Sequence, residues 1–175
     1  MKKAWIALLA LAVATPASAQ MNHGEDMSLA AIRGLHETVA GYIVAAAEQM
    51  PETDYAYKPT PDVRSFGELL GHVANATPMF CASATGMQRP STGDAEKLMS
   101  KAEIVSAVKA AFAFCEDAYK MDAMKGGESV TFFGQQHTRL SVLAFNMGHN
   151  FEHYGNIVTY MRLKGMVPPS SQGGM

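Results

Sequence analysis

The chain has 175 residues, of which 48% are hydrophobic and 17% are charged. This length and apolar content suit one compact domain with its own core, and they exclude a disordered chain. The formal net charge is −2 and no run of basic residues occurs, which argues against nucleic acid and against an anionic membrane surface as partners.

Residues 1–19 have the layout of a secretory signal peptide. Lys2 and Lys3 precede an apolar run of about ten residues, and a small-x-small end follows at residues 17–19. The run is too short to span a bilayer, which takes about 20 residues. We therefore expect cleavage after Ala19, a mature domain over residues 20–175, and an exported, periplasmic protein. Cleavage leaves 12 basic and 16 acidic residues, a net charge of −4.

The first half of the mature chain predicts two helices. Apolar residues at helical spacing predict a helix over residues 28–50. A Pro-rich connection follows, and the capping-box sequence S-F-G-E then opens a second helix at Ser65. Gly86 is the expected end of this helix. Pro78 should kink it, because proline removes one backbone hydrogen bond and crowds the preceding turn.

The second half predicts two more helices. A second capping box, S-K-A-E, opens a helix over residues 100–121. The stretch K-G-G-E-S-V-T-F-F-G is typical of a connector with a few extended residues, and a long helix follows over residues 136–164. Four long helices without a strand pattern indicate an all-α fold, a four-helix bundle.

Two histidines of the last helix, His149 and His153, are spaced so that both can bind the same metal ion. Residues four apart lie on the same helix face, so both imidazoles can bind one metal ion. His149 and His153 lie about a third of a turn away from the apolar stripe of the last helix. His72 lies at the same offset from the apolar stripe of the second helix. Three neutral imidazoles on two facing helices would hold a divalent metal and leave a position for water. The alternative is that all three are rim or core residues without a ligand.

The other histidines are weaker candidates. We expect His36 to pack against the core, His137 to lie on the polar face near the start of the last helix, and His23 to belong to the mature N-terminus. Imidazole suits zinc, nickel, copper and iron alike, so the ligands do not select the metal. Zinc is the first expectation and nickel the second.

Glu152 is the candidate catalytic residue. Residues 149–153 read H-x-x-E-H, the signature of inverted zinc peptidases, in which this glutamate is the general base. Those enzymes need a further acidic ligand downstream, and no Asp or Glu follows Glu152. We therefore interpret the peptidase match as coincidental. Glu152 is kept as a base or as a group next to the metal ligands, with a solvated surface position as the alternative.

Cys81 and Cys115 are the two cysteines of the chain. In an oxidising compartment such a pair favours a disulfide, provided that the fold brings the two residues together. The alternative is two small buried residues that never meet.

Three blocks of sequence resemble a known family. They are D-Y-A-Y-K-P at residues 54–59, R-S-F-G-E-L-L-G-H-V-A at residues 64–74 and E-H-Y-G-N-I-V-T-Y-M-R-L-K-G-M-V-P-P at residues 152–169. In this order and spacing they resemble the DinB-like (damage-inducible) superfamily over essentially the whole mature chain.

The resemblance implies an up-down-down-up four-helix bundle, often dimeric, with a divalent metal on a histidine triad. By position the triad is His72, His149 and His153. The implied topology makes the second and third helices parallel, which puts the two cysteines at similar heights and favours a Cys81–Cys115 disulfide.

The resemblance also implies a class of reaction. Family members include thiol S-transferases and an isomerase that use low-molecular-weight thiols, and an open metal position suits them because a metal lowers the pKa of a thiol or water. The expected function is a metal-dependent transferase or hydrolase acting on an unknown small molecule, with a metal-bound water or thiol as nucleophile. A non-catalytic periplasmic metal-binding or stress protein is the alternative.

Overall fold

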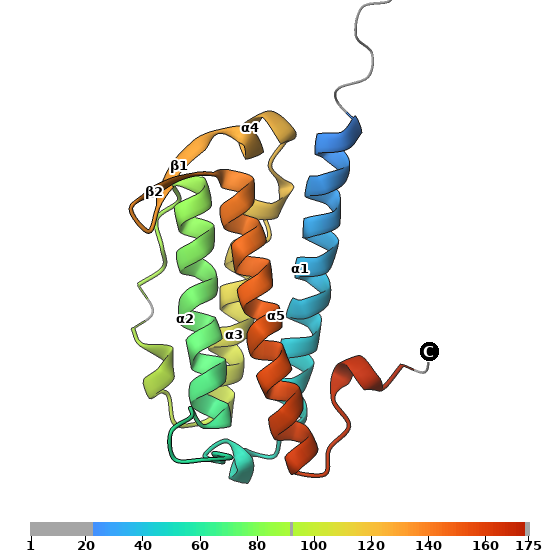
Figure 1. Cartoon of the computed structure of the whole chain (residues 1–175). Coiled ribbons are helices and arrows are strands. Elements are labelled where there is room, and N and C mark those ends of the chain that lie inside the picture. Colours follow the sequence, from blue (N-terminus) through green and yellow to red (C-terminus); the bar gives the residue numbers. More distant parts are fainter. Residues whose placement is uncertain (1–22, 92, 174–175) are drawn as a thin grey trace, which may run out of the picture.

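The computed structural model describes residues 23–91 and 93–173, and the predicted signal segment 1–19 lies outside them. Four long helices lie side by side (Figure 1): α1 (His23–Gln49), α2 (Phe66–Thr85), α3 (Lys101–Cys115) and α5 (Arg139–Leu163). None of the helices in these ranges combines the length and the apolar character needed to cross a membrane.

The helices follow the predicted up-down-down-up course. Helices α1 and α5 run in one direction and α2 and α3 in the other (Figure 1), because the segment between α2 and α3 returns along the whole bundle. This crossover segment carries a 3₁₀ helix, η2 (Ala95–Lys97), which packs against α2. The all-α four-helix bundle is confirmed.

The signals that predicted α2 work as expected. The Ser65 hydroxyl accepts a hydrogen bond from the Glu68 backbone amide at 3.2 Å, and the Glu68 carboxylate accepts one from the Ser65 amide at 2.6 Å. Gly86 ends the helix in the left-handed region, at φ 79°, where glycine carries no steric penalty. The helix continues past Pro78.

Three predicted helix boundaries were wrong, the first being the start of α1, which lies at His23 rather than near residue 28. Helix α3 ends at Cys115 rather than near residue 121, and a separate 3₁₀ helix, η3 (Ala118–Lys120), follows. It buries Tyr119, whose hydroxyl donates to the Leu143 carbonyl at 2.9 Å. A tertiary contact therefore overrides the helical pattern.

The third wrong boundary is the start of α5. Residues 136–138 belong to strand β2 (Gln135–Thr138), which pairs antiparallel with β1 (Ser129–Phe132). Helix α5 begins only at Arg139, where the Thr138 side chain caps the Ser141 amide. The few extended residues expected in this connector are confirmed as a hairpin. The remaining short elements are η1 (Glu52–Asp54), α4 (Ala123–Gly127) and η4 (Pro169–Ser171).

A cysteine pair crosslinks α2 and α3 in the core of the bundle. Cys81 on α2 and Cys115 at the end of α3 are both fully buried, and their Sγ atoms lie at disulfide bonding distance, with Cα atoms 5.6 Å apart. The pair links the two parallel helices, as the family resemblance led us to expect. It lies in the same apolar cluster as Phe80 and Leu143.

Candidate metal site

Three histidines converge between α2 and α5. His149 and His153 stand one turn apart on α5, and their Nε2 atoms are 3.0 Å apart. His72 faces them from α2, with its Nε2 atom 3.3 Å from that of His149. One ligand atom from each ring lies within 4.8 Å of the others. These three residues, the histidine cluster, are the set predicted from the sequence.

A buried polar ladder fixes how α2 and α5 meet beside the cluster. The Thr77 hydroxyl donates to Asn150 at 3.1 Å, Asn150 donates to Asn146 at 3.3 Å, and Asn146 donates to the Tyr119 hydroxyl at 3.0 Å. Buried amides need such partners, so a shift of α5 along α2 would break the Thr77–Asn150 hydrogen bond that joins the two helices. The ladder therefore holds the ring of His149, next in sequence to Asn150, opposite α2.

Glu96 orients the third histidine. Its Oε1 atom lies 2.9 Å from Nδ1 of His72, so Nδ1 carries the proton and Nε2 faces the cluster with a free lone pair. Burial alone would raise the pKa of Glu96, but hydrogen bonds from Arg64 and His72 outweigh it and the pKa lies below its usual value. Glu96 therefore stays a carboxylate at neutral pH. Sequence reasoning missed this residue.

A glycine brings Glu96 within reach. A Cβ atom at Gly71 would lie 2.4 Å from the Ala95 carbonyl oxygen and 2.8 Å from the Glu96 Cα, so only glycine allows η2 to lie this close to α2. Asn75 supports the same contact, because its side-chain oxygen accepts the Ala95 amide at 3.0 Å.

The electrostatics of the cluster favour neutral rings. Burial, followed by the neighbouring His149 and His72 rings, lowers the pKa of His153 to about 4. Burial, followed by the charge of His72, also lowers the pKa of His149. Neutral imidazoles are the form that binds metal ions.

The donor set fits a divalent metal ion. Imidazole nitrogens that face one another at 3.0–3.3 Å bring lone pairs or N–H groups into contact unless a cation or a shared proton lies between them. Three nitrogens bound to one zinc ion at about 2.0–2.1 Å would lie roughly 3.3 Å apart in tetrahedral geometry.

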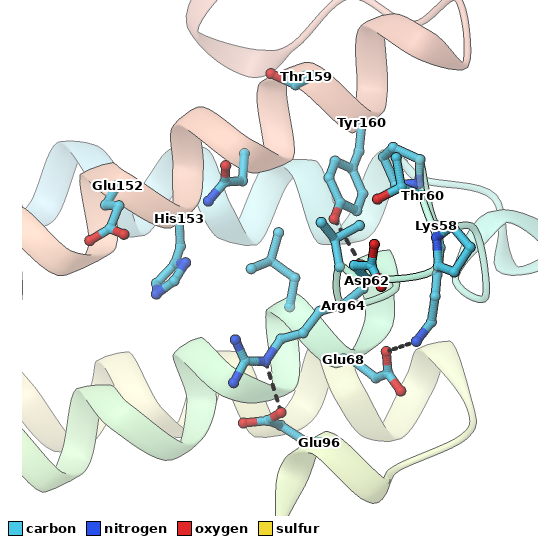
Figure 2. Close-up of a pocket in the computed structure, with 15 residues that line it drawn as sticks. Lys58, Thr60, Asp62, Arg64, Glu68, Glu96, Glu152, His153, Thr159 and Tyr160 are labelled. Atoms are coloured by element: carbon cyan, nitrogen blue, oxygen red, sulfur yellow. Dashed lines mark hydrogen bonds and ion pairs between the residues drawn. The ribbon is translucent and has the colours of Figure 1, made fainter.

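A pocket of about 800 Å³ opens beside the cluster. Figure 2 shows His153 and Glu152 from α5 at one end, and Lys58, Thr60 and Asp62 of the connection before α2 at the other. The Arg64 side chain reaches across it. A pocket of this size suits a small molecule.

The comparisons with known proteins agree with this architecture. The sequence profile of the DinB superfamily matches residues 35–157, most of the chain. This protein belongs to the DinB superfamily. A comparison with curated proteins found no significant match.

Two solved structures share the DinB fold. A DinB-like protein from Bacillus cereus ATCC 10987 is 16% identical, with a TM-score of 0.68 over 78% of this chain and 94% of its own. A DinB-like protein from Bacillus subtilis is 20% identical, with a TM-score of 0.64 over 83% of this chain and 99% of its own. At these identities the likeness supports the fold alone.

In this DinB-superfamily protein an aromatic group packs against His149. The ring of Phe80 is 5.1 Å from that of His149 and 5.3 Å from that of Phe145. Phe145 and Phe133 are more than half exposed, and Phe133 sits at the tip of the β1–β2 hairpin with φ 48°. Sequence reasoning placed Phe133 in a connector and predicted no such group.

The remaining candidates lie apart from the histidine cluster. His36 packs in the core as predicted, stacked on Tyr119 at 3.9 Å, and burial lowers its pKa to about 4. His137 lies in strand β2, so its predicted place on the last helix was wrong. Glu152 is exposed and lines the pocket. Asn146 is fully buried, as part of the polar ladder.

Proposed function

We propose that this DinB-superfamily protein binds one divalent metal ion through His72, His149 and His153 and acts as a metal-dependent transferase or hydrolase on a small molecule. Zinc is the first candidate and nickel the second, because both accept three imidazoles and an exchangeable ligand. The observation that carries the proposal is the convergence of three imidazole nitrogens beside an open pocket.

The ion would supply a coordination position at which water or a thiol loses a proton near neutral pH. The chain itself provides the other parts of the chemistry. Glu96 keeps His72 in the tautomer that leaves Nε2 free. Glu152, on the pocket wall next to His153, is the candidate to take up the released proton. Tyr160 lines the pocket. It fixes the backbone at Arg64, because its hydroxyl donates to the Arg64 carbonyl at 2.8 Å.

The pocket favours an enzyme over a non-catalytic metal-binding protein. A protein that only stores or senses a metal gains by closing all coordination positions with its own side chains, as structural zinc sites do. Here the described residues offer three ligand atoms, and the side of the cluster near His153 borders the pocket.

We also propose that the protein is exported to the periplasm after cleavage at Ala19. The amino-terminal layout supports this, and the bonding distance between Cys81 and Cys115 agrees with it, because disulfides persist in oxidising compartments. An exported member would use a thiol or ester substrate available there.

Activity assays of the mature protein test the catalytic proposal. The protein is loaded with zinc or nickel and assayed for transfer of small thiols to 1-chloro-2,4-dinitrobenzene and for hydrolysis of p-nitrophenyl acetate. The expected result is a rate that disappears on chelation and in a His149→Ala/His153→Ala variant. In Glu152→Gln the rate should fall at least tenfold at unchanged metal content. A rate that is indifferent to metal would contradict the proposal, and metal binding without either activity would favour the non-catalytic alternative.

A further inference from the structure

Arg64 is held in a fixed position next to the histidine cluster. Its Nε atom donates to Oε2 of Glu96 at 2.9 Å, the same carboxylate that binds His72 through Oε1. Its carbonyl oxygen accepts the Tyr160 hydroxyl at 2.8 Å. Figure 2 shows the guanidinium directed toward the His153 end of the pocket. The contacts at both ends of the residue reduce the freedom that an exposed arginine normally has.

The outer face of this guanidinium has hydrogen-bonding capacity left. Among the described residues, its two Nη atoms have no hydrogen-bond partner, and 45% of the side chain is exposed. The other cation of the pocket, Lys58, is already paired with Glu68 at 2.9 Å. The planar fork of arginine matches a carboxylate with two parallel hydrogen bonds, which a lysine cannot reproduce.

The surroundings favour an anion close to Arg64. Glu96 is shared between Arg64 and His72 through its two carboxylate oxygens. A metal ion on the cluster would add positive charge on the same side. Asp62 and Glu152 also line the pocket, but both are exposed to solvent, which screens them. Val63, Leu69 and Pro59 supply apolar wall.

We propose that the substrate carries a carboxylate group that Arg64 binds, with a short apolar linker between this carboxylate and the group that reaches the histidine cluster. The inference rests on the proposed metal-dependent function and adds the substrate class to it. It makes Arg64 the residue that selects small carboxylic acids, such as thiol or ester acids, over neutral molecules of the same length.

Cobalt-loaded protein gives a direct test, because a thiol that binds cobalt produces an absorption band that can be titrated without turnover. The probes are 3-mercaptopropionate and its neutral amide, 3-mercaptopropionamide. Wild type should bind the acid at least about tenfold more tightly than the amide, the typical value of a charge-assisted hydrogen bond. Arg64→Gln should bring this ratio close to one, and Arg64→Lys should retain part of it.

Lys58→Gln is the matched control, since it removes a positive charge from the same pocket and should leave the ratio unchanged. Circular dichroism and cobalt content are measured for every variant. If cobalt-loaded wild type shows no preference for the acid, or if the preference survives in Arg64→Gln, the role of Arg64 is overturned while the metal site stands. Failure of the folded wild type to bind cobalt would overturn the metal site and this inference together.

Discussion

The Glu96 carboxylate lies 2.9 Å from Nδ1 of His72 and connects the crossover segment to the histidine cluster. The same carboxylate holds Arg64 through its second oxygen. One residue in a 3₁₀ helix therefore orients both a candidate metal ligand and a candidate substrate-binding side chain. The geometry of the site depends on how closely η2 lies against α2.

Replacement of Glu96 should weaken metal binding without unfolding the bundle. In Glu96→Gln the affinity for zinc is expected to fall about 10- to 100-fold, because the amide no longer fixes the His72 tautomer as a carboxylate does. Competition with a chromophoric chelator measures the affinity. Glu37→Gln, which changes an exposed carboxylate on α1, is the control. Equal zinc affinities in Glu96→Gln and wild type would show that Glu96 does not orient His72 for metal binding.

Gly71→Ala should weaken the metal site indirectly, by displacing η2 and with it Glu96. The added methyl group would meet the Ala95 carbonyl oxygen at 2.4 Å, so η2 must move and Glu96 with it. We expect a loss of about 1–3 kcal/mol in the free energy of unfolding and weaker zinc binding. Gly41→Ala on α1, where a Cβ atom meets nothing within 4 Å, should be neutral or stabilising by up to about 1 kcal/mol. Urea denaturation of both variants decides whether the close approach matters.

The Cys81–Cys115 pair should contribute directly to stability. Cys81→Ala/Cys115→Ala, or reduction of the wild type, is expected to lower the free energy of unfolding by about 2–4 kcal/mol, since the crosslink closes a loop of 34 residues. Denaturation with and without a reducing agent measures it. The double variant provides the control, because a reducing agent should not change its stability. A wild-type protein indifferent to reduction would mean that the disulfide is not formed.

Burial of His36 predicts a specific loss of stability in acid. Its pKa is about 4 in the folded protein against an ordinary value of 6.5, so between these values the unfolded state binds the extra proton. Stability should therefore be constant above about pH 6.5 and fall as the pH drops toward 4, by at most about 1.4 kcal/mol per pH unit from this group. His36→Phe keeps a ring against Tyr119 and should reduce the slope. An unchanged slope would contradict the assignment.

The fold could be predicted from the sequence wherever a local signal decides an element. The capping boxes at Ser65 and Ser100 and the terminal Gly86 placed three helix ends correctly, because each depends on neighbours in the chain. The end of α3 and the start of α5 were missed. Both depend on tertiary contacts: the burial of Tyr119 and the pairing of β1 with β2.

The same division holds for the site. His149 and His153 were recognisable because i, i+4 spacing is a local property of a helix, and His72 followed from its offset on the facing helix. Glu96 was not recognisable, since it comes from a loop 24 residues after His72 and reaches the ring only because Gly71 admits the backbone of η2. Arg64 was missed for the same reason: its position depends on Glu96.

The central claim is that the histidine cluster binds a metal ion, and metal analysis of the mature protein tests it most directly. The protein is purified untagged and its metal content is measured beside His149→Ala/His153→Ala, with His137→Ala as the control that removes a histidine outside the cluster. The account predicts about one zinc or nickel ion per chain in the wild type and in His137→Ala, and none in the folded double variant. A folded wild-type protein that stays metal-free after reconstitution with zinc and with nickel would contradict it.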